Sequence, residues 1–354
     1  MILTKKSSDT INILKCLLCI GIVFIHVYIR PGESKLLLGS SWKLGESYQN
    51  FVFFQHVFID LFLNHVCVPL FFCISGFLYF LSAPPKFSFY WFINKWKSRM
   101  KSLLIPYLIA NAIFIVVIEF YMILYEGKSF DLNLLISGFW ALDNGNPANP
   151  PLWFLRDLMI AIILSPLIYS SIKKTLWLLP LILGLVWVLN KEMSLNLWMI
   201  DACFFFSLGA CLSIKEIDLL SLFTKSFLWY FIIYIVLLGI YLIYSYTLLL
   251  RISVFFGFAL FISVSKQIEK RGGDAFILRE KKFVVITFFI YLFHIYIAGF
   301  MWRPFCLILG TSETSLFFSY FGGALTTIII LYYIFVLLNY FLPKLTTLLI
   351  GSRY

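Results

Sequence analysis

Residues 10–30 read TINILKCLLCIGIVFIHVYIR and form an apolar run that is long enough to cross a bilayer. The run carries one cation near its start, Lys15, and one imidazole near its far end, His26. Ionisable side chains are costly in hydrocarbon and by default mark a functional site. Eleven residues at about 100° each return to nearly the same helix face, about 16 Å further along the axis. The sequence therefore predicts a cation and a candidate base on one stripe of one helix.

The same pair also has a structural interpretation. Lys15 can extend its long side chain to the membrane interface, and His26 can be an interior histidine whose ring nitrogens are satisfied by neighbouring groups. This stretch by itself leaves both interpretations open, so the rest of the chain has to decide between them.

The composition is that of a membrane protein. Of the 354 residues, 62% are hydrophobic, 20% are aromatic and 13% are charged, and the mean hydropathy is +0.94. Soluble folds do not need so many long apolar runs. The length accommodates about ten spans with short connections, which leaves no room for a sizeable soluble domain. We therefore expect residues 1–354 to form a single all-α, polytopic integral-membrane domain.

The apolar runs predict ten transmembrane helices. They lie at residues 10–29, 62–82, 103–125, 152–171, 176–190, 197–214, 226–247, 250–265, 283–302 and 316–342. Two lysines precede the first run and no small-residue cleavage site closes it, so we interpret it as an uncleaved signal anchor. A cytoplasmic N-terminus puts 20 of the 28 Lys and Arg residues on the inner side. By the positive-inside rule, both termini are then expected in the cytoplasm.

The net charge of +11 follows from the same asymmetry. Cations spread over the ends of apolar runs indicate topology, so we expect no nucleic-acid partner. The strongly basic inner loop at 265–282 is expected to contact anionic headgroups of membrane lipids. On the outer side, the loops at 30–61 and 126–151 either simply connect helices or shape a pocket for an external substrate. Within the first of them, the apolar residues 51–62 are expected to form a short interfacial helix.

The seven cysteines give no sign of a metal centre. They lie within or at the edge of apolar runs, and they show neither a CxxC nor a Cys/His pattern at metal spacing. Packing is therefore the expected role for them, and no metal ligand is predicted.

Polar side chains also enter the fourth and ninth predicted helices. Arg156 and Asp157, in PPLWFLRDLMI, lie about two turns deep from the outer side. Adjacent residues on a helix point about 100° apart, so we expect each to pair with a different partner. His294, in FFIYLFHIYI, has aromatic neighbours and no acid on its own helix face. That setting favours a buried structural histidine.

The cytoplasmic segment 92–107, FINKWKSRMKSLLIPY, is strongly basic at a membrane entrance. Lys95, Lys97, Arg99 and Lys101 could hold a polyphosphate by charge and hydrogen bonds. The competing interpretation is that these cations only fix the topology, as positive-inside residues do.

The segment PLFFCISGFLYF places Ser75 and Gly76 in the inner half of the second predicted helix. Small residues allow close approach of either a ligand or a neighbouring helix, and helix packing is the simpler interpretation.

Taken together, these elements resemble the acyltransferase 3 family of integral-membrane acyltransferases. The resemblance covers nearly the whole chain and depends on the order and spacing of five motifs. These are the basic-x10-His spacing of the first helix, VPLFFCISGFL, the basic stretch ending in LLIPY, PLWFLRDL, and YLFH. The sequences of the segments PLWFLRDLMI and SRMKSLLIPY most resemble those of family members that modify surface glycans in Gram-negative bacteria.

The resemblance implies a ten-helix core in the bacterial cytoplasmic (inner) membrane. Such a core takes an acyl group from cytoplasmic acyl-CoA and delivers it to a hydroxyl presented on the outer side. The acceptor is then a surface glycan, a lipid-linked sugar or a smaller hydroxylated molecule. Acetyl-CoA is the expected co-substrate because the family commonly uses it, and no bound cofactor is implied.

Individual residues can be matched to the motifs of the family. His26 matches the catalytic histidine, and Lys15 matches its basic partner, which is more usually arginine. Arg99 matches the first arginine of an inner-side RxxR motif. Ser102 takes the place of the second arginine, with Lys101 beside it. This departure leaves open which cation binds the CoA phosphates.

The expected site then has three parts. His26 is the expected general base, because a neutral imidazole suits proton removal from an acceptor hydroxyl. Acyl-CoA binding is expected from Lys15, Lys95, Arg99, Lys101, Ser75 and Gly76. Acceptor binding or orientation of His26 is expected from Trp153, Arg156, Asp157 and His294. Direct transfer and a transient acyl-His26 both remain open, and the group that orients His26 is either Asp157 or a tyrosine hydroxyl from another helix.

Membrane proteins of other functional classes are expected to show different sequence features. In a multi-pass transporter, His26 with Arg156 and Asp157 would form a proton or solute pathway, but the chain shows neither internal repeats nor pairs of Gly/Pro-broken helices. A glycan polymerase or ligase acting on a lipid-linked sugar would favour larger, Arg-rich outer loops. An unrelated membrane O-acyltransferase is the remaining alternative within the enzyme class.

Overall fold

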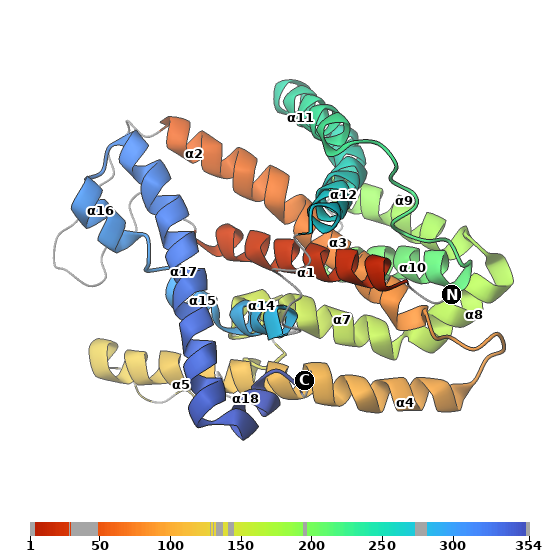
Figure 1. The fold of residues 1–354 in the computed structure, drawn as a ribbon, viewed down its shortest axis with the longest axis horizontal. Helices are drawn as coiled ribbons and strands as arrows, with labels where there is room; N and C mark the ends of the chain where they lie inside the picture. Colours follow the sequence, from red (N-terminus) through yellow and green to blue (C-terminus); the bar gives the residue numbers. More distant parts are fainter. Residues whose placement is uncertain are drawn as a thin grey trace.

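The computed structural model describes residues 4–27, 29, 49–127, 129, 131, 137–140, 145–193, 197–272 and 282–351. Throughout these ranges the regular structure is helical (Figure 1). The α-helices are α1 (Lys5–His26), α2 (Gln49–Gln55), α3 (His65–Phe80), α4 (Phe89–Arg99), α5 (Ile105–Glu126), α7 (Trp153–Ile163), α8 (Ser165–Thr175), α9 (Leu178–Glu192), α10 (Ile200–Ile214), α11 (Phe227–Tyr244), α12 (Thr247–Lys270), α14 (Lys282–Phe293), α15 (Ile295–Ala298), α16 (Arg303–Leu309), α17 (Glu313–Phe341) and α18 (Pro343–Leu349). Two π-helical segments, η1 (His56–Asn64) and η2 (Met100–Leu104), and one 3₁₀ turn, η3 (Pro150–Leu152), complete the regular structure.

The predicted fold class, an all-α polytopic membrane protein, is confirmed. Each of the ten apolar runs overlaps a helix, and six helices among the described residues are long and apolar enough to cross a membrane. Two pairs of bent helices raise that number to eight if each pair is one span. Two further apolar helices, α9 and α10, are shorter. The chain therefore has the architecture of a multi-pass membrane protein.

Two of the helices are longer than the sequence predicts. Residues 49–80 form one apolar stretch through α2, η1 and α3. Residues 51–62 thus continue into the second span. The prediction of a separate interfacial helix over these residues is therefore wrong. No Gly or Pro interrupts residues 49–64, so nothing in the sequence stops the helix. Likewise, the basic segment continues through η2 into the third span, over Phe89–Tyr125. Much of the predicted outer loop (30–48) and of the basic inner loop (273–281) lies outside the described residues.

The fourth predicted span is broken between α7 and α8, which meet at 58°. Pro166, at the start of α8, has no N–H and its ring clashes with the carbonyl of the residue four before it, Ile162. The freed Ile162 oxygen accepts a hydrogen bond of 2.9 Å from Trp96 Nε1. The break therefore docks α7 onto α4.

A second break separates α14 from α15, with a bend of 55°. The expectation that the chain lacks Gly/Pro-broken helix pairs is wrong for the first break, at Pro166. Only the first break carries a proline signal, because the residue at the second break is His294.

Helix α1 lies in the middle of the bundle, with α2 on one side, α7 and α14 on the other, and α3 crossing it in this view (Figure 1). It packs against α3, α12, α14 and α17. Its side chains Ile13, Leu14, Leu18 and Val23 are fully buried. The helix that carries Lys15 and His26 is thus held on several sides by other helices.

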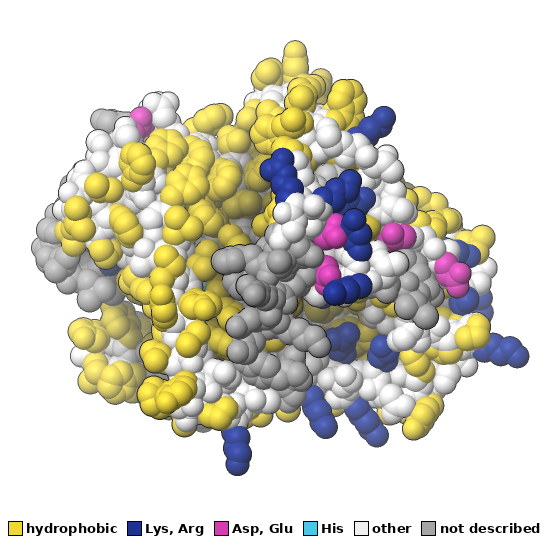
Figure 2. All heavy atoms as spheres, viewed as in Figure 1, with side chains coloured by type: hydrophobic (Ala, Val, Ile, Leu, Met, Phe, Trp, Pro, Cys, Tyr) yellow, Lys and Arg dark blue, Asp and Glu magenta, His cyan; other side chains and the backbone are white. Residues whose placement is uncertain are grey.

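Charged and apolar side chains occupy different parts of the surface of the bundle. Figure 2 shows most of the Lys and Arg side chains of this face on its right half, toward the starts of α1 and α4, and hydrophobic side chains over the left half. Helix α11 exposes large apolar residues, among them Ile232, Val236 and Ile243. A soluble protein rarely leaves so much contiguous apolar surface uncovered, whereas a lipid-facing helix requires it.

Candidate functional site

A cavity of about 420 Å³ is lined by residues of α1, α3, α4, η2, α7 and α14. Two cations, Lys15 and Arg99, are among the residues that line it. Ser75, Tyr79 and Ser102 add polar groups, and most of the remaining lining consists of Phe, Leu and Ile side chains. Apolar walls with cations among them suit a ligand that has an apolar arm and an anionic end.

The other cations of the basic segment take different positions. Lys95 lies over the rings of Trp91 and Tyr79, with Nζ 5.2 and 5.9 Å from the two ring centroids. Because Tyr79 lines the cavity, Lys95 borders it without being part of the lining. Lys101 is exposed and is not among the residues that line the cavity. Among the four cations of this segment, Arg99 is thus the one that lines the cavity.

The turn that follows Arg99 is held by the far end of the chain. Gly351, with φ +69°, lies against the backbone of Lys101 and Ser102. A Cβ at Gly351 would come within 2.6 Å of Ser102 Cα, and the positive φ itself disfavours other residues. Contacts between α18 and α5 support the same arrangement. The residue that replaces the second arginine of the RxxR motif is therefore fixed at the cavity wall.

Gly76 and Ser75 face different surroundings. Ser75 lines the cavity, whereas Gly76 faces α10, where a Cβ would overlap the carbonyl oxygen of Phe206. On the opposite helix, a Cβ at Gly209 would overlap the carbonyl oxygen of Cys73. The two glycines thus allow α3 and α10 to meet backbone to backbone. Gly76, which the family resemblance assigns to acyl-CoA binding, serves helix packing in this structure.

His26 ends α1 and is partly exposed. Its Nδ1 lies 2.8 Å from the carbonyl oxygen of Ile22, one turn earlier in the same helix. The ring of His294 stands edge-on beside it, with the two ring centroids 4.8 Å apart. The cavity lining includes Lys15 and Cys19 of α1 but not His26. The two ends of the predicted stripe therefore lie in different surroundings, one in the cavity and one beside a second histidine.

His294 lies at the break between α14 and α15 and is fully buried. Its Nδ1 is 2.8 Å from the carbonyl oxygen of Tyr291, an oxygen that the N–H of Ile295 would bind in an unbroken helix. A side chain that enters the backbone hydrogen-bond ladder in this way is a recognised cause of a kink. The histidine thus accounts for a bend that no proline signals.

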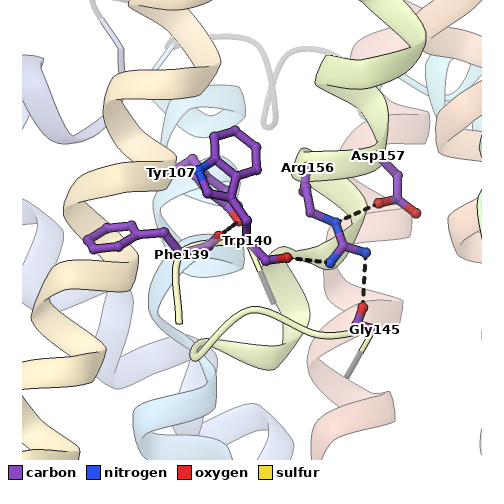
Figure 3. Close-up of polar contacts among 6 residues, drawn as sticks. All are labelled: Tyr107, Phe139, Trp140, Gly145, Arg156 and Asp157. Carbon is purple, nitrogen blue, oxygen red and sulfur yellow. Dashed lines mark hydrogen bonds and ion pairs between the residues drawn. The ribbon is translucent and has the colours of Figure 1, made fainter. Parts of the chain in front are cut away.

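Arg156 and Asp157 are fully buried and pair with each other (Figure 3). Arg156 Nε donates to Asp157 Oδ1 at 2.9 Å, so the prediction of separate partners is wrong for this contact. The other two guanidinium nitrogens donate to the carbonyl oxygens of Trp140 and Gly145, at 2.8 and 2.9 Å. In Figure 3 the guanidinium points at this loop, and the hydroxyl of Tyr107 donates to a carbonyl oxygen in the same loop.

Of the two candidates for orienting His26, Asp157 is engaged elsewhere. Asp157 bonds to Arg156, and the hydrogen bond at His26 Nδ1 goes to a backbone carbonyl. Trp153, at the start of α7, packs against Phe72 of α3 with ring centroids 6.4 Å apart. The structure thus brings His26 together with His294 rather than with the residues of α7.

Sequence reasoning missed several residues that contact Arg156 or lie near helix ends. The guanidinium of Arg156 lies 4.8 Å from the ring centroid of Trp198. Nearby in the chain, Trp187 donates from Nε1 to Asp201 at 2.7 Å. The guanidinium of Arg251 lies 4.2 Å from the Trp187 ring. Single Trp, Asp and Arg residues at helix ends carry no spacing signal, so the sequence could not group them.

Comparisons with known proteins agree with the motifs. Residues 9–336 match the family model Acyl_transf_3, described as an acyltransferase domain. The chain is also 35% identical over 176 residues to the succinoglycan biosynthesis protein ExoH of Rhizobium meliloti (strain 1021). That match covers 47% of this chain and 44% of the relative, so it spans somewhat less than half of each protein. No solved structure matches the chain.

Proposed function

Because the chain belongs to the acyltransferase 3 family, we propose that it is a membrane-embedded O-acyltransferase that moves an acyl group from cytoplasmic acyl-CoA to a hydroxyl on the outer side of the bacterial inner membrane. The observation that carries the proposal is the cavity beside α1, which places Lys15 and Arg99 in one apolar-walled site. Its volume lies in the range of small-molecule sites, roughly 300–1,000 Å³.

The proposed topology has ten membrane-embedded helices and both termini in the cytoplasm. Contacts between distant segments are consistent with it. Lys6 pairs with Glu269 at 3.5 Å, and both belong to the proposed inner side. Arg251 lies over Trp187, and both belong to the proposed outer side. Together with the positive-inside asymmetry, these contacts support one orientation.

The cavity is the proposed site of the acyl-CoA arm. Lys15 and Arg99 would bind the anionic end of the donor, with Lys95 at the border, and the apolar walls would take the pantetheine arm. From Lys15 to His26 is about 16 Å along the helix, which is comparable to an extended pantetheine arm. The thioester would then reach the end of α1 while the nucleotide stays near the inner cations.

His26 is the proposed general base. The Ile22 carbonyl oxygen can only accept, so Nδ1 of the neutral ring carries the proton and Nε2 carries the lone pair. Nε2 would remove the proton of the acceptor hydroxyl as its oxygen attacks the thioester carbonyl. The C–S bond then breaks, and the proton passes from His26 to the CoA thiolate. A base of this kind typically contributes 10²–10⁴-fold to the rate.

A surface polysaccharide is the proposed acceptor. The related ExoH is named for succinoglycan biosynthesis, and a lipid-linked precursor sugar would present the same hydroxyl chemistry. At the proposed outer side, Trp198 is 47% exposed and covers the buried Arg156. Exposed aromatic faces of this kind suit the apolar faces of sugar rings. Trp153, Arg156 and Asp157 would shape the site at which the acceptor enters beside Trp198.

Loss of the protein from its bacterium tests the function. Surface polysaccharide is isolated from cells with and without the protein, and ester-linked acyl groups are identified by mass spectrometry. We expect one acyl ester to disappear, to return with the wild-type chain, and not to return with His26→Ala. The His56→Ala variant is the control, since His56 is exposed and bonds Asp60 of its own helix. An unchanged ester pattern in cells without the protein would contradict the proposal and favour the transporter class.

A further inference from the structure

The cavity beside α1 ends before it reaches His26. Among the residues of α1 that line it, Cys19 is the closest to His26, and it lies seven residues earlier in the helix. Seven residues correspond to about 10 Å along the helix axis. Group transfer requires the reacting atoms to lie within about 3–3.5 Å of each other. A donor thioester held within this cavity is therefore still separated from the proposed base.

A series of aromatic rings connects the wall of the cavity with His26. Phe154 of α7 and Phe288 of α14 line the cavity. The ring centroid of Tyr291 lies 6.2 Å from that of Phe154 and 6.3 Å from that of Phe288. On its other side, Tyr291 is 6.2 Å from the ring of His294, which is 4.8 Å from that of His26. Aromatic side chains thus stand between the donor cavity and the proposed base.

These rings are held in two different ways. The hydroxyl of Tyr291 donates to the carbonyl oxygen of Pro151 at 2.7 Å, and this bond is buried. Tyr291 cannot move without leaving a buried carbonyl oxygen unpaired, which is unfavourable. Phe154 has no polar group, and its ring packs against Phe71 and Phe72, with centroids 5.6 and 4.6 Å away. A change of rotamer at Phe154 therefore breaks no hydrogen bond.

We propose that Phe154 is the gate between the donor cavity and His26, and that its ring keeps water away from the thioester until the acceptor is in place. The inference rests on the proposed donor cavity and on the proposed role of His26 as base. While the ring of Phe154 packs against Tyr291, the thioester stays on the cavity side. When the ring turns away, the thioester passes beside Tyr291 and meets the acceptor hydroxyl at His26.

A gate at this position decides between transfer and hydrolysis. His26 is partly exposed, so water reaches the side of the gate that faces the base. In hydrolysis, the oxygen of water bonds to the acyl carbon and the C–S bond breaks, which releases the free acid and CoA. His26 Nε2 takes a proton from water and returns it to the CoA thiolate. Water and a sugar hydroxyl follow the same chemistry, so the closed ring is what excludes water before the acceptor binds.

The test measures hydrolysis of acetyl-CoA without any acceptor. The full chain is reconstituted in lipid nanodiscs, and free [¹⁴C]acetate released from [¹⁴C]acetyl-CoA is counted. Phe154→Ala removes the ring and is expected to raise acetate release at least about 10-fold over the wild type, because the thioester then reaches water and the base together. The Kd for acetyl-CoA should not change, since Lys15 and Arg99 are retained. Adding His26→Ala to Phe154→Ala should remove the rise.

Two further variants control for loosened packing. Phe258→Ala is the matched control, because Phe258 is also buried but packs against Phe205 and does not line the cavity. It should release acetate at the wild-type rate. Tyr291→Phe keeps the ring and removes only the bond to Pro151. It should raise acetate release about 3- to 10-fold, the equivalent of one neutral hydrogen bond.

Thermal unfolding and acetyl-CoA binding show which variants are folded. A wild-type rate of acetate release in folded Phe154→Ala would overturn the inference, and so would an equal rise in Phe258→Ala. If Phe154→Ala does not fold, Tyr291→Phe decides in the same way. Full transfer to polysaccharide by His26→Ala would instead overturn the proposed function. Transfer that depends on His26, without extra acetate from either gate variant, would overturn the inference alone.

Discussion

Lys15 of α1 and Arg99 at the end of α4 line the same cavity, although they come from segments far apart in the chain. Lys15 lies halfway along α1, and Arg99 is the last residue of α4. Because Ser102 stands where a second arginine is usual, these two residues are the cations within the described cavity lining. The pair therefore replaces the expected RxxR motif as the candidate site for the donor's phosphates.

Removal of either cation should weaken donor binding. Arg99→Ala and Lys15→Ala are each expected to raise the Kd for acetyl-CoA about 10- to 100-fold, because a hydrogen bond to a charged group contributes about 1.5–3 kcal/mol. Isothermal titration in nanodiscs measures the change. Lys174→Ala, at the exposed C-terminal end of α8, is the matched control and should leave Kd unchanged. Unaltered affinity in both cavity variants would count against the donor site.

The glycine contact between α3 and α10 should control stability rather than catalysis. Gly76→Ala forces a Cβ into the backbone of Phe206 and is expected to cost at least about 1–3 kcal/mol through overpacking. Thermal unfolding in detergent measures the loss. Gly239→Ala in α11 is the control, since a Cβ there meets no atom within 4 Å. A Gly76→Ala protein of normal stability that binds acetyl-CoA poorly would assign Gly76 to the ligand instead.

The buried pair Arg156–Asp157 should tolerate removal of both charges better than removal of one. Arg156→Leu leaves a buried carboxylate without its partner and is expected to cost about 3–5 kcal/mol. Arg156→Leu combined with Asp157→Leu should recover part of that loss, because no uncompensated charge remains. Unfolding temperatures of the single and double variants give the comparison. Equal stability of the wild type and Arg156→Leu would show that the pair is exposed to water.

His26 and His294 should each occupy the tautomer protonated at Nδ1. The Ile22 and Tyr291 carbonyls accept from that nitrogen in His26 and His294. The chain has only four histidines, so ¹⁵N-histidine labelling gives a spectrum that the His26→Ala and His294→Phe variants can assign. We expect a protonated Nδ1 and a bare Nε2 in each neutral ring. A protonated Nε2 in neutral His26 would remove the proposed base.

The positions of the helices could largely be predicted from the sequence, because each apolar run is long enough to be recognised as a membrane helix. Their ends were less predictable, since residues 49–64 have no Gly or Pro to separate a loop helix from the span. Of the two bends, Pro166 marks one in the sequence. The bend at His294 depends on a side-chain bond to the backbone, which no residue pattern encodes.

The residues of the candidate site could be predicted from the sequence, but the contacts among these residues could not. The spacing from Lys15 to His26 identified both residues, but the separation of the cavity from His26 depends on packing among several helices. Helix geometry alone suggested different partners for Arg156 and Asp157. The long guanidinium side chain instead turns back to its neighbour while the loop carbonyls hold its other nitrogens. His294 came beside His26 only through the contact of α14 and α15 with α1.

The most direct test of the central claim follows a labelled acyl group through the purified protein. Nanodisc-embedded wild type, His26→Ala and His56→Ala are incubated with [¹⁴C]acetyl-CoA and with surface polysaccharide from a strain that lacks the protein. Parallel reactions use labelled succinyl-CoA, and the label bound to polysaccharide through alkali-labile esters is counted. Label should appear with wild type and His56→Ala and fall at least about 100-fold with His26→Ala. Equal labelling by His26→Ala and the wild type would contradict the account.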